Sequence, residues 1–147
     1  MIILKETNER ELSTLSRMER QPHARNFLDA TSLAGHQKNF SNPDIIYLSI
    51  VKEDGAVAGY IILGIEKRPD SVEFRRVVID KHQIGIGQTV IKKMESYCKT
   101  KLYAKRICLD VYEDNAKAIY VYEKLGYRRF KTEKRGERLL HFYDKKV

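Results

Sequence analysis

The stretch HQIGIGQTVIKKM, residues 82–94, places two glycines at the start of what its apolar spacing predicts to be an amphipathic helix. Glycine destabilises a helix by about 1 kcal/mol relative to alanine, so Gly85 and Gly87 indicate a need for bare backbone. A helix N-terminus offers unpaired N–H groups and about half a positive charge. The stretch therefore predicts either a phosphate-binding loop or a tight turn without a ligand.

Two well-known phosphate-binding patterns do not fit these glycines. A dinucleotide fingerprint needs a third glycine, and the chain has Val90 at that position. A P-loop needs a lysine after its last glycine, and the run Gly87-Gln88-Thr89 lacks one. The glycine pair alone is therefore a weak signal.

A second informative stretch is LDVYEDNAKAIYVYEKLGY, residues 109–127. It predicts a strand, then a helix capped by Asn115 and ended by Gly126. Asn115, Ala118 and Tyr122 lie three and four residues apart, so they share one face of that helix. This face either forms a groove that ends at the Tyr122 hydroxyl or simply packs against the rest of the protein.

The rest of the chain predicts alternating short elements around these two stretches. They are a strand over 2–5, a helix from about 8 to 18, a helical segment near 27–40, strands over 45–51, 57–65 and 72–79, a helix ending near 103, and strands over 106–112, 127–132 and 138–144. The order βααβββαβαββ predicts an α+β fold, with a mixed, mostly antiparallel sheet flanked by helices. We expect a single domain over residues 1–147.

The strand over 72–79 is expected to alternate its side chains between two faces. One face would carry Val72, Phe74, Arg76 and Val78, and the other the residues between them.

Composition narrows the class of protein. The 147 residues are 42% hydrophobic and 33% charged, which is typical of a soluble globular chain. No apolar run approaches the roughly 20 residues of a membrane span, and the N-terminus lacks a signal-peptide pattern. Cys98 and Cys108 match no metal-ligand spacing, so buried thiols in a reducing compartment are expected. We expect a cytoplasmic protein without a metal and without a membrane partner.

The charge balance favours a polyanionic partner. Lys and Arg number 28 against 20 Asp and Glu, giving a net charge of +8. Residues 128–147 hold eight bases and three acids, which a solvated strand face also explains. A phosphorylated co-substrate and a nucleic acid both fit this charge. A basic nucleic-acid-binding module is the alternative from another class, but no RRM, KH or OB signature supports it.

Together, the two stretches resemble the GNAT superfamily of N-acetyltransferases. The family loop reads Arg/Gln-x-x-Gly-x-Gly/Ala, and the chain has HQIGIG over 82–87. The family helix reads Asn-x-x-Ala-x-x-x-Tyr-x-Lys-x-Gly-Phe/Tyr, and the chain matches it over 115–127. The resemblance covers nearly the whole chain, and His82 departs from the usual Arg or Gln.

The resemblance implies a GNAT fold with acetyl-CoA as co-substrate. The strand before the glycines would pair with the pantetheine arm, the loop would bind the pyrophosphate, and the later helix would contact the pantetheine and the thioester. The residues implied are Val77, Val78 and Ile79 on the strand, His82, Gln83, Ile84, Gly85, Ile86, Gly87 and Gln88 in the loop, and Asn115, Ala118 and Tyr122 on the helix.

The implied reaction moves an acetyl group to a primary amine by direct attack. Tyr122 would be the general acid that protonates the leaving thiolate, and a backbone N–H near Val78 would hold the oxyanion. Glu73 is the candidate base, although an ion pair with Arg75 or Arg76 explains it as well. His23, His36 and His141 match no catalytic pattern and are expected at the surface.

The sequence does not distinguish a small-molecule acceptor from a protein N-terminus or a protein lysine. A degenerate domain that binds acetyl-CoA without turnover is a further alternative. A nucleic-acid partner is not expected, and a homodimer stays open.

Overall fold

The computed structural model describes residues 1–25, 31–68, 70–80 and 85–147. The N-terminal half contains β1 (Ile2–Glu6), the 3-10 turn η1 (Glu9–Glu11), α1 (Leu12–Met18), α2 (Pro22–Arg25), α3 (Leu33–Phe40), β2 (Ile45–Lys52), β3 (Val57–Ile65) and β4 (Ser71–Ile79). The C-terminal half contains α4 (Gly87–Lys101), β5 (Arg106–Tyr112), α5 (Ala116–Lys124), β6 (Arg128–Arg135) and β7 (Arg138–Lys146).

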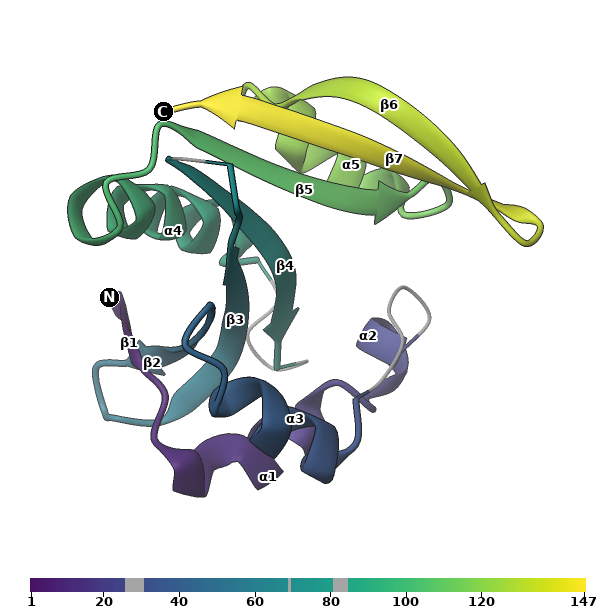
Figure 1. Cartoon of the computed structure of the whole chain (residues 1–147). Coiled ribbons are helices and arrows are strands. Elements are labelled where there is room, and N and C mark those ends of the chain that lie inside the picture. The colour runs from purple at the N-terminus through teal and green to yellow at the C-terminus, as the bar shows by residue number, and fades with distance from the viewer. Residues whose placement is uncertain (26–30, 69, 81–84) are drawn as a thin grey trace.

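The seven strands form one sheet in the order β1-β2-β3-β4-β5-β7-β6. Every neighbouring pair is antiparallel except β4 and β5, which run parallel (Figure 1). The helix α4 supplies the crossover that a parallel pair requires. The predicted mixed, mostly antiparallel sheet with flanking helices is confirmed.

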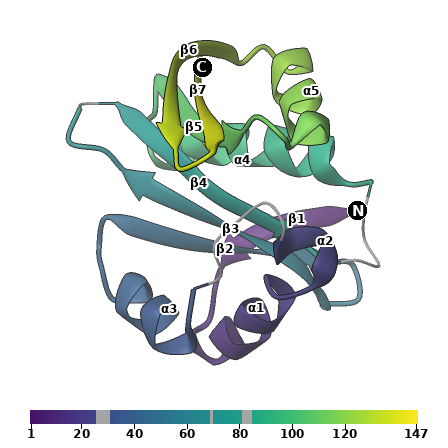
Figure 2. The ribbon, with the colours of Figure 1, turned by 90° about the vertical axis from the view of Figure 1, so that its right-hand side faces the viewer.

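Helices cover both faces of the sheet, as Figure 2 shows. On one face, α4 and α5 pack through residues such as Met94 and Tyr122 against the larger hydrophobic core. On the other, α1 packs through Leu12 and Leu15 against a smaller cluster that includes Tyr60 of β3. Among the described residues, no helix is long and apolar enough to cross a membrane.

The predicted helical segment near 27–40 is partly wrong. A short helix, α2, begins at Pro22, where the missing N–H of proline is tolerated at a first helical position. The next described helix, α3, begins only at Leu33, because the Ser32 side chain caps it by accepting from the Gly35 N–H. Residues 26–30 lie outside the described part of the chain.

The predicted alternation along β4 is also wrong. The register against β3 shifts between Ile62 and Leu63, which pair with Arg76 and Phe74, so Arg75 is an extra residue in β4. Such a β-bulge turns the following side chains to the opposite face. Val77 and Ile79 therefore join Val72 and Phe74 against the larger core, while Val78 joins the smaller cluster.

The sheet opens between β4 and β5. Their pairing covers only Ser71–Glu73 of β4 and Arg106–Cys108 of β5. Beyond these residues the two strands diverge (Figure 1), so the segment from Phe74 to Ile79 has a neighbour strand on one side only. This opening positions the candidate site.

Candidate active site

The glycine loop leads into the N-terminus of α4. Gly85 has a φ of 116°, a conformation that side-chain-bearing residues rarely adopt, and Gly87 is the first helical residue. Ile86 is the N-cap, and it provides no side-chain hydrogen bond to the first turn of the helix. Among the described residues, a Cβ added at Gly87 would meet only the Ile79 Cδ1 atom, at 4.0 Å. Within the part of the chain that the structure describes, the N-cap residue therefore leaves the N–H groups of the first turn of α4 without a capping side chain.

The predicted loop residues His82, Gln83 and Ile84 lie outside the described part of the chain. The last predicted loop residue, Gln88, lies in the first turn of α4.

The free edge of β4 exposes alternate backbone groups. The Asp80 N–H bonds to the Ala58 carbonyl, and Ile79 pairs with Gly59. In an antiparallel ladder, this hydrogen bond makes Ile79 and Gly59 a non-hydrogen-bonded pair. The N–H and C=O of Ile79 therefore point away from β3, as do those of Val77. By the same alternation, the backbone groups of Val78 are directed to β3.

A histidine from α2 contacts this free edge. The His23 Nε2 atom lies 2.7 Å from the Ile79 carbonyl oxygen. The side chain is half-buried, in contrast to the surface position expected for it. One acceptor on the edge is therefore already hydrogen-bonded to the N-terminal half.

Of the predicted residues of α5, Tyr122 reaches the opening through its contact with Phe74. Asn115 is the N-cap of α5, and its side chain accepts from the Ala118 N–H at 3.3 Å. Tyr122 is buried, and its ring meets those of Phe74 and Tyr127 edge-on. Burial, and secondarily the charge of Asp110, raises the pKa of Tyr122 to about 12.

Asp110 of β5 is a residue that sequence reasoning did not select for the site. Its side chain contacts solvent, but partial desolvation and then the charge of Glu73 raise its pKa above the usual value. Glu73 thus contributes to the raised pKa of Asp110, and Asp110 to the raised pKa of Tyr122.

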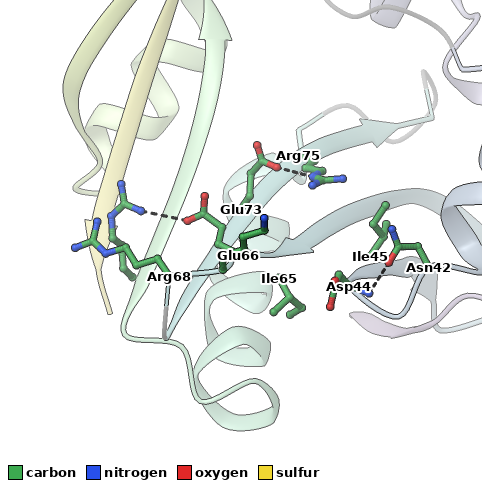
Figure 3. A pocket seen from close by; sticks show the side chains of 10 residues that line it. Asn42, Asp44, Ile45, Ile65, Glu66, Arg68, Glu73 and Arg75 are labelled. Atoms are coloured by element: carbon green, nitrogen blue, oxygen red, sulfur yellow. Dashed lines mark hydrogen bonds and ion pairs between the residues drawn. The ribbon is translucent and has the colours of Figure 1, made fainter.

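Glu73 lies on the face of β4 opposite Phe74 and lines a hollow of about 600 Å³. Its carboxylate forms an ion pair with Arg75, as Figure 3 shows, and both side chains are partly exposed. The ion-pair partner of Glu73 is thus Arg75. Arg76 instead pairs with Glu19, at 2.8 Å.

A buried polar cluster around Glu19 was missed by sequence reasoning. The Glu19 side chain is fully buried and accepts hydrogen bonds from the Tyr60 hydroxyl at 2.6 Å, Arg76 at 2.8 Å and the Thr31 N–H at 2.8 Å. The His36 Nε2 atom lies 2.9 Å from the same carboxylate. Burial alone would raise the pKa of Glu19, but the hydrogen bonds from His36 and Tyr60 outweigh it and lower that pKa.

The expected surface positions of two histidines are wrong. His36 is fully buried, because Glu19 on one side and the Tyr47 hydroxyl on the other satisfy its two ring nitrogens. His141 is also buried, and its Nδ1 atom lies 2.8 Å from the Thr132 hydroxyl. Both are polar groups whose cost of burial is offset by hydrogen bonds.

The expected buried thiols are confirmed. Cys98 and Cys108 are both free and buried, and burial raises the pKa of each to about 12. Neither is therefore a reactive thiolate near neutral pH.

These features define a class of protein: the chain belongs to the acetyltransferase (GNAT) family, whose model matches residues 9–127. The predicted resemblance and the enzyme class, an acyltransferase, are confirmed. Among curated relatives, the L-amino acid N-acetyltransferase AaaT of Escherichia coli is 26% identical over 133 residues, covering 86% of this chain and 82% of the relative.

Solved structures share the fold over nearly the whole chain. The spermidine N-acetyltransferase of Vibrio cholerae in complex with CoA and spermine has a TM-score of 0.84 at 16% identity, covering 99% of this chain and 95% of the other. The aminoglycoside acetyltransferase AAC(6')-Ib in complex with coenzyme A and kanamycin has a TM-score of 0.83 at 16% identity, with the same coverage.

Proposed function

We propose that the protein is an acetyl-CoA-dependent N-acetyltransferase that moves the acetyl group to a primary amine by direct attack. The observation that carries this proposal is the free edge of β4 beside the uncapped N-terminus of α4, with Tyr122 at the same opening. A long ligand with an anionic end and an amide-bearing arm matches both features. The names of the relatives given above refer to amino acids, polyamines and aminoglycosides, all of which carry amines.

The cofactor end of the proposed site consists of three parts. Loop residues from His82 to Gln88 bind the pyrophosphate through backbone N–H groups, which the α4 dipole reinforces. Val77 offers its N–H and C=O to the pantetheine arm, and Ile79 offers its N–H, because His23 already contacts the Ile79 carbonyl. Val78 lies between them. Asn115 and Ala118 line the α5 side, where a small side chain leaves room.

The chemistry requires two proton transfers. The amine nitrogen forms a bond to the acetyl carbon, the carbon–sulfur bond breaks, and Tyr122 protonates the leaving thiolate. The raised pKa keeps the Tyr122 hydroxyl protonated near neutral pH. The same apolar surroundings would raise the pKa of a thiolate, which favours the transfer.

The second proton leaves the amine. Glu73 takes it as general base, directly or through water, on the opposite face of the opening from Tyr122. A free backbone N–H on the β4 edge, at Val77 or Ile79, stabilises the oxyanion.

Acetyl-CoA is expected to raise the melting temperature, because it binds only the folded chain. Gly87→Val should abolish this shift at the same ligand concentration, since a branched side chain would occupy the space that the phosphate needs. The melting temperature without ligand should change little, because a Cβ at Gly87 meets only Ile79 Cδ1. Thermal denaturation with and without acetyl-CoA measures both effects.

A short oligonucleotide serves as the comparison ligand in this measurement. A shift with the oligonucleotide but none with millimolar acetyl-CoA would favour the nucleic-acid-binding alternative. Steep weakening with salt would support that outcome, because DNA binding releases counterions.

Glu73→Gln is expected to remove the rising limb of the pH–rate profile and to lower kcat/KM by roughly 100-fold, the lower end of general-base effects. Glutamine keeps the shape of the side chain but takes no proton. The measurement is thiol release from acetyl-CoA between pH 6 and 9 with an active acceptor. An unchanged profile would assign Glu73 to the ion pair alone.

A non-catalytic acetyl-CoA-binding domain is the remaining alternative. It predicts a thermal shift with acetyl-CoA but no thiol release with any amine acceptor. A screen of amine acceptors separates it from the enzyme.

A further inference from the structure

The Glu73–Arg75 ion pair is partly exposed and lies near the start of β4. The side chains are 32% and 45% accessible, respectively, and the hollow that they line lies at the start of β4, while the glycine loop follows its end. Such partly exposed pairs contribute little to stability, so they open at little cost. The pair therefore presents an anion and a cation side by side to an incoming molecule.

A glycine in β3 makes room for the cation. A Cβ added at Gly64 would lie 2.6 Å from the Arg75 Nε atom and 2.9 Å from its Cζ atom, so the guanidinium lies flat against this residue. Glycine weakens a strand interior and often marks a close approach. Gly64 and the bulge at Arg75 together hold the guanidinium beside Glu73.

We propose that the acceptor is a free α-amino acid, whose ammonium group replaces Arg75 on Glu73 while its carboxylate binds the released Arg75. An α-amino acid carries both charges on neighbouring atoms, so one small molecule satisfies both halves of the opened pair. A guanidinium matches a carboxylate with two parallel hydrogen bonds. Glu73 takes one proton from this ammonium, which gives the neutral amine that attacks the acetyl carbon. The second N–H proton, lost after the attack, passes to water.

The charges around the pair favour this class of acceptor over a polyamine. Among the described residues, the hollow is lined by four cationic and three anionic side chains, a balance of 4 − 3 = +1: Lys67, Arg68, Arg75 and Arg106 against Asp44, Glu66 and Glu73. Arg106 is held by Glu66 at 3.3 Å and Asp144 at 2.9 Å. A polyamine would meet like charges there and leave Arg75 without a partner.

This inference rests on the proposed acetyl transfer, and matched acceptor pairs test it separately. The probes are leucine with isopentylamine and phenylalanine with phenethylamine, each pair differing only by the carboxylate. We expect kcat/KM of the wild type to favour the amino acid by at least about 10-fold, since hydrogen bonds to charged groups are the strong ones. Arg75→Gln should lower kcat/KM for the amino acid by roughly 10- to 100-fold and should not lower it for the amine.

Three further variants refine the test. Arg75→Lys should fall between the wild type and Arg75→Gln, because it keeps the charge but loses the planar fork. Gly64→Ala should reduce the amino-acid preference although the charge of Arg75 remains, because the guanidinium must move. Arg128→Gln, the same charge change on an exposed part of β6, should leave the preference unchanged.

The outcomes separate the two proposals. Thiol release with amines lacking a carboxylate, at rates equal to or above those with amino acids, overturns the inference and leaves acetyl transfer standing. A preference that survives both Arg75→Gln and Gly64→Ala also overturns it. Thiol release with neither class, together with no thermal shift by acetyl-CoA, overturns the proposed function and the inference with it.

Discussion

Tyr122→Phe is expected to lower kcat by roughly 10- to 1000-fold, because a general acid contributes about 10²–10⁴-fold and water partly replaces it. Phenylalanine keeps the ring that packs edge-on against Phe74 and Tyr127. Folding and acetyl-CoA affinity should therefore change little, and the loss should fall on kcat rather than on KM. Steady-state thiol release with an active acceptor, from pH 6 to 9, measures the effect.

Tyr127→Phe is the matched control for the loss of a buried hydroxyl. Tyr127 is fully buried next to Tyr122 and belongs to the larger core, outside the proposed site. The kcat of Tyr127→Phe should stay within about two-fold of the wild-type value, since the proposed mechanism assigns no proton transfer to Tyr127. Full kcat in Tyr122→Phe across the whole pH range would leave Tyr122 as a packing residue.

Glu19→Gln is expected to lower the free energy of unfolding by about 3 kcal/mol, because it removes the buried negative charge that binds Arg76 and accepts from Tyr60. For a chain of this length the melting temperature should fall by about 10 °C. The variant should also lose stability less steeply in acid. The lowered pKa of Glu19 gives the wild type stability above its unfolded pKa of about 4.5, and that stability is lost as the pH falls through the folded value.

Glu9→Gln provides the comparison for a charge change without burial. Glu9 is exposed at the start of η1, so the melting temperature of the Glu9→Gln variant should stay within about 2 °C of that of the wild type. Thermal denaturation of both variants at pH 4 and pH 7 measures the size of the stability loss and whether it becomes smaller in acid. Equal melting temperatures for Glu19→Gln and the wild type at pH 7 would contradict the importance of this buried pair.

The sequence predicted the C-terminal half more closely than the N-terminal helices. Asn115 and Gly126 mark the two ends of α5, because an N-cap and a glycine with a φ of 98° act locally and leave a residue signature. In the N-terminal half, the short helix at Pro22–Arg25 precedes a second start at Ser32. The predicted segment near 27–40 therefore missed the first short helix and placed the start of the second too early, because a single turn of helix is too short to show a periodicity.

The candidate site was predicted where its motifs are local and missed where its contacts are distant. The glycines before α4 and the Asn-Ala-Tyr face of α5 occur within single elements, so spacing alone selects them. Glu19 and Arg76, in contrast, are separated by 57 positions, and only tertiary packing brings them together. The bulge at Arg75 was missed because the doublets Arg75-Arg76 and Val77-Val78 fit a regular strand with two mixed faces as well as a strand with one extra residue.

The short parallel contact between β4 and β5 has a consequence for folding kinetics. The hairpins β2–β3 and β6–β7 form between strands that follow one another in the sequence. In contrast, Ser71 pairs with Arg106, which is 35 residues later in the chain. Loop-closure entropy makes such distant pairings slow to form. During refolding, fluorescence or circular dichroism would therefore recover before enzymatic turnover, because the catalytic opening exists only after the two halves of the chain have docked.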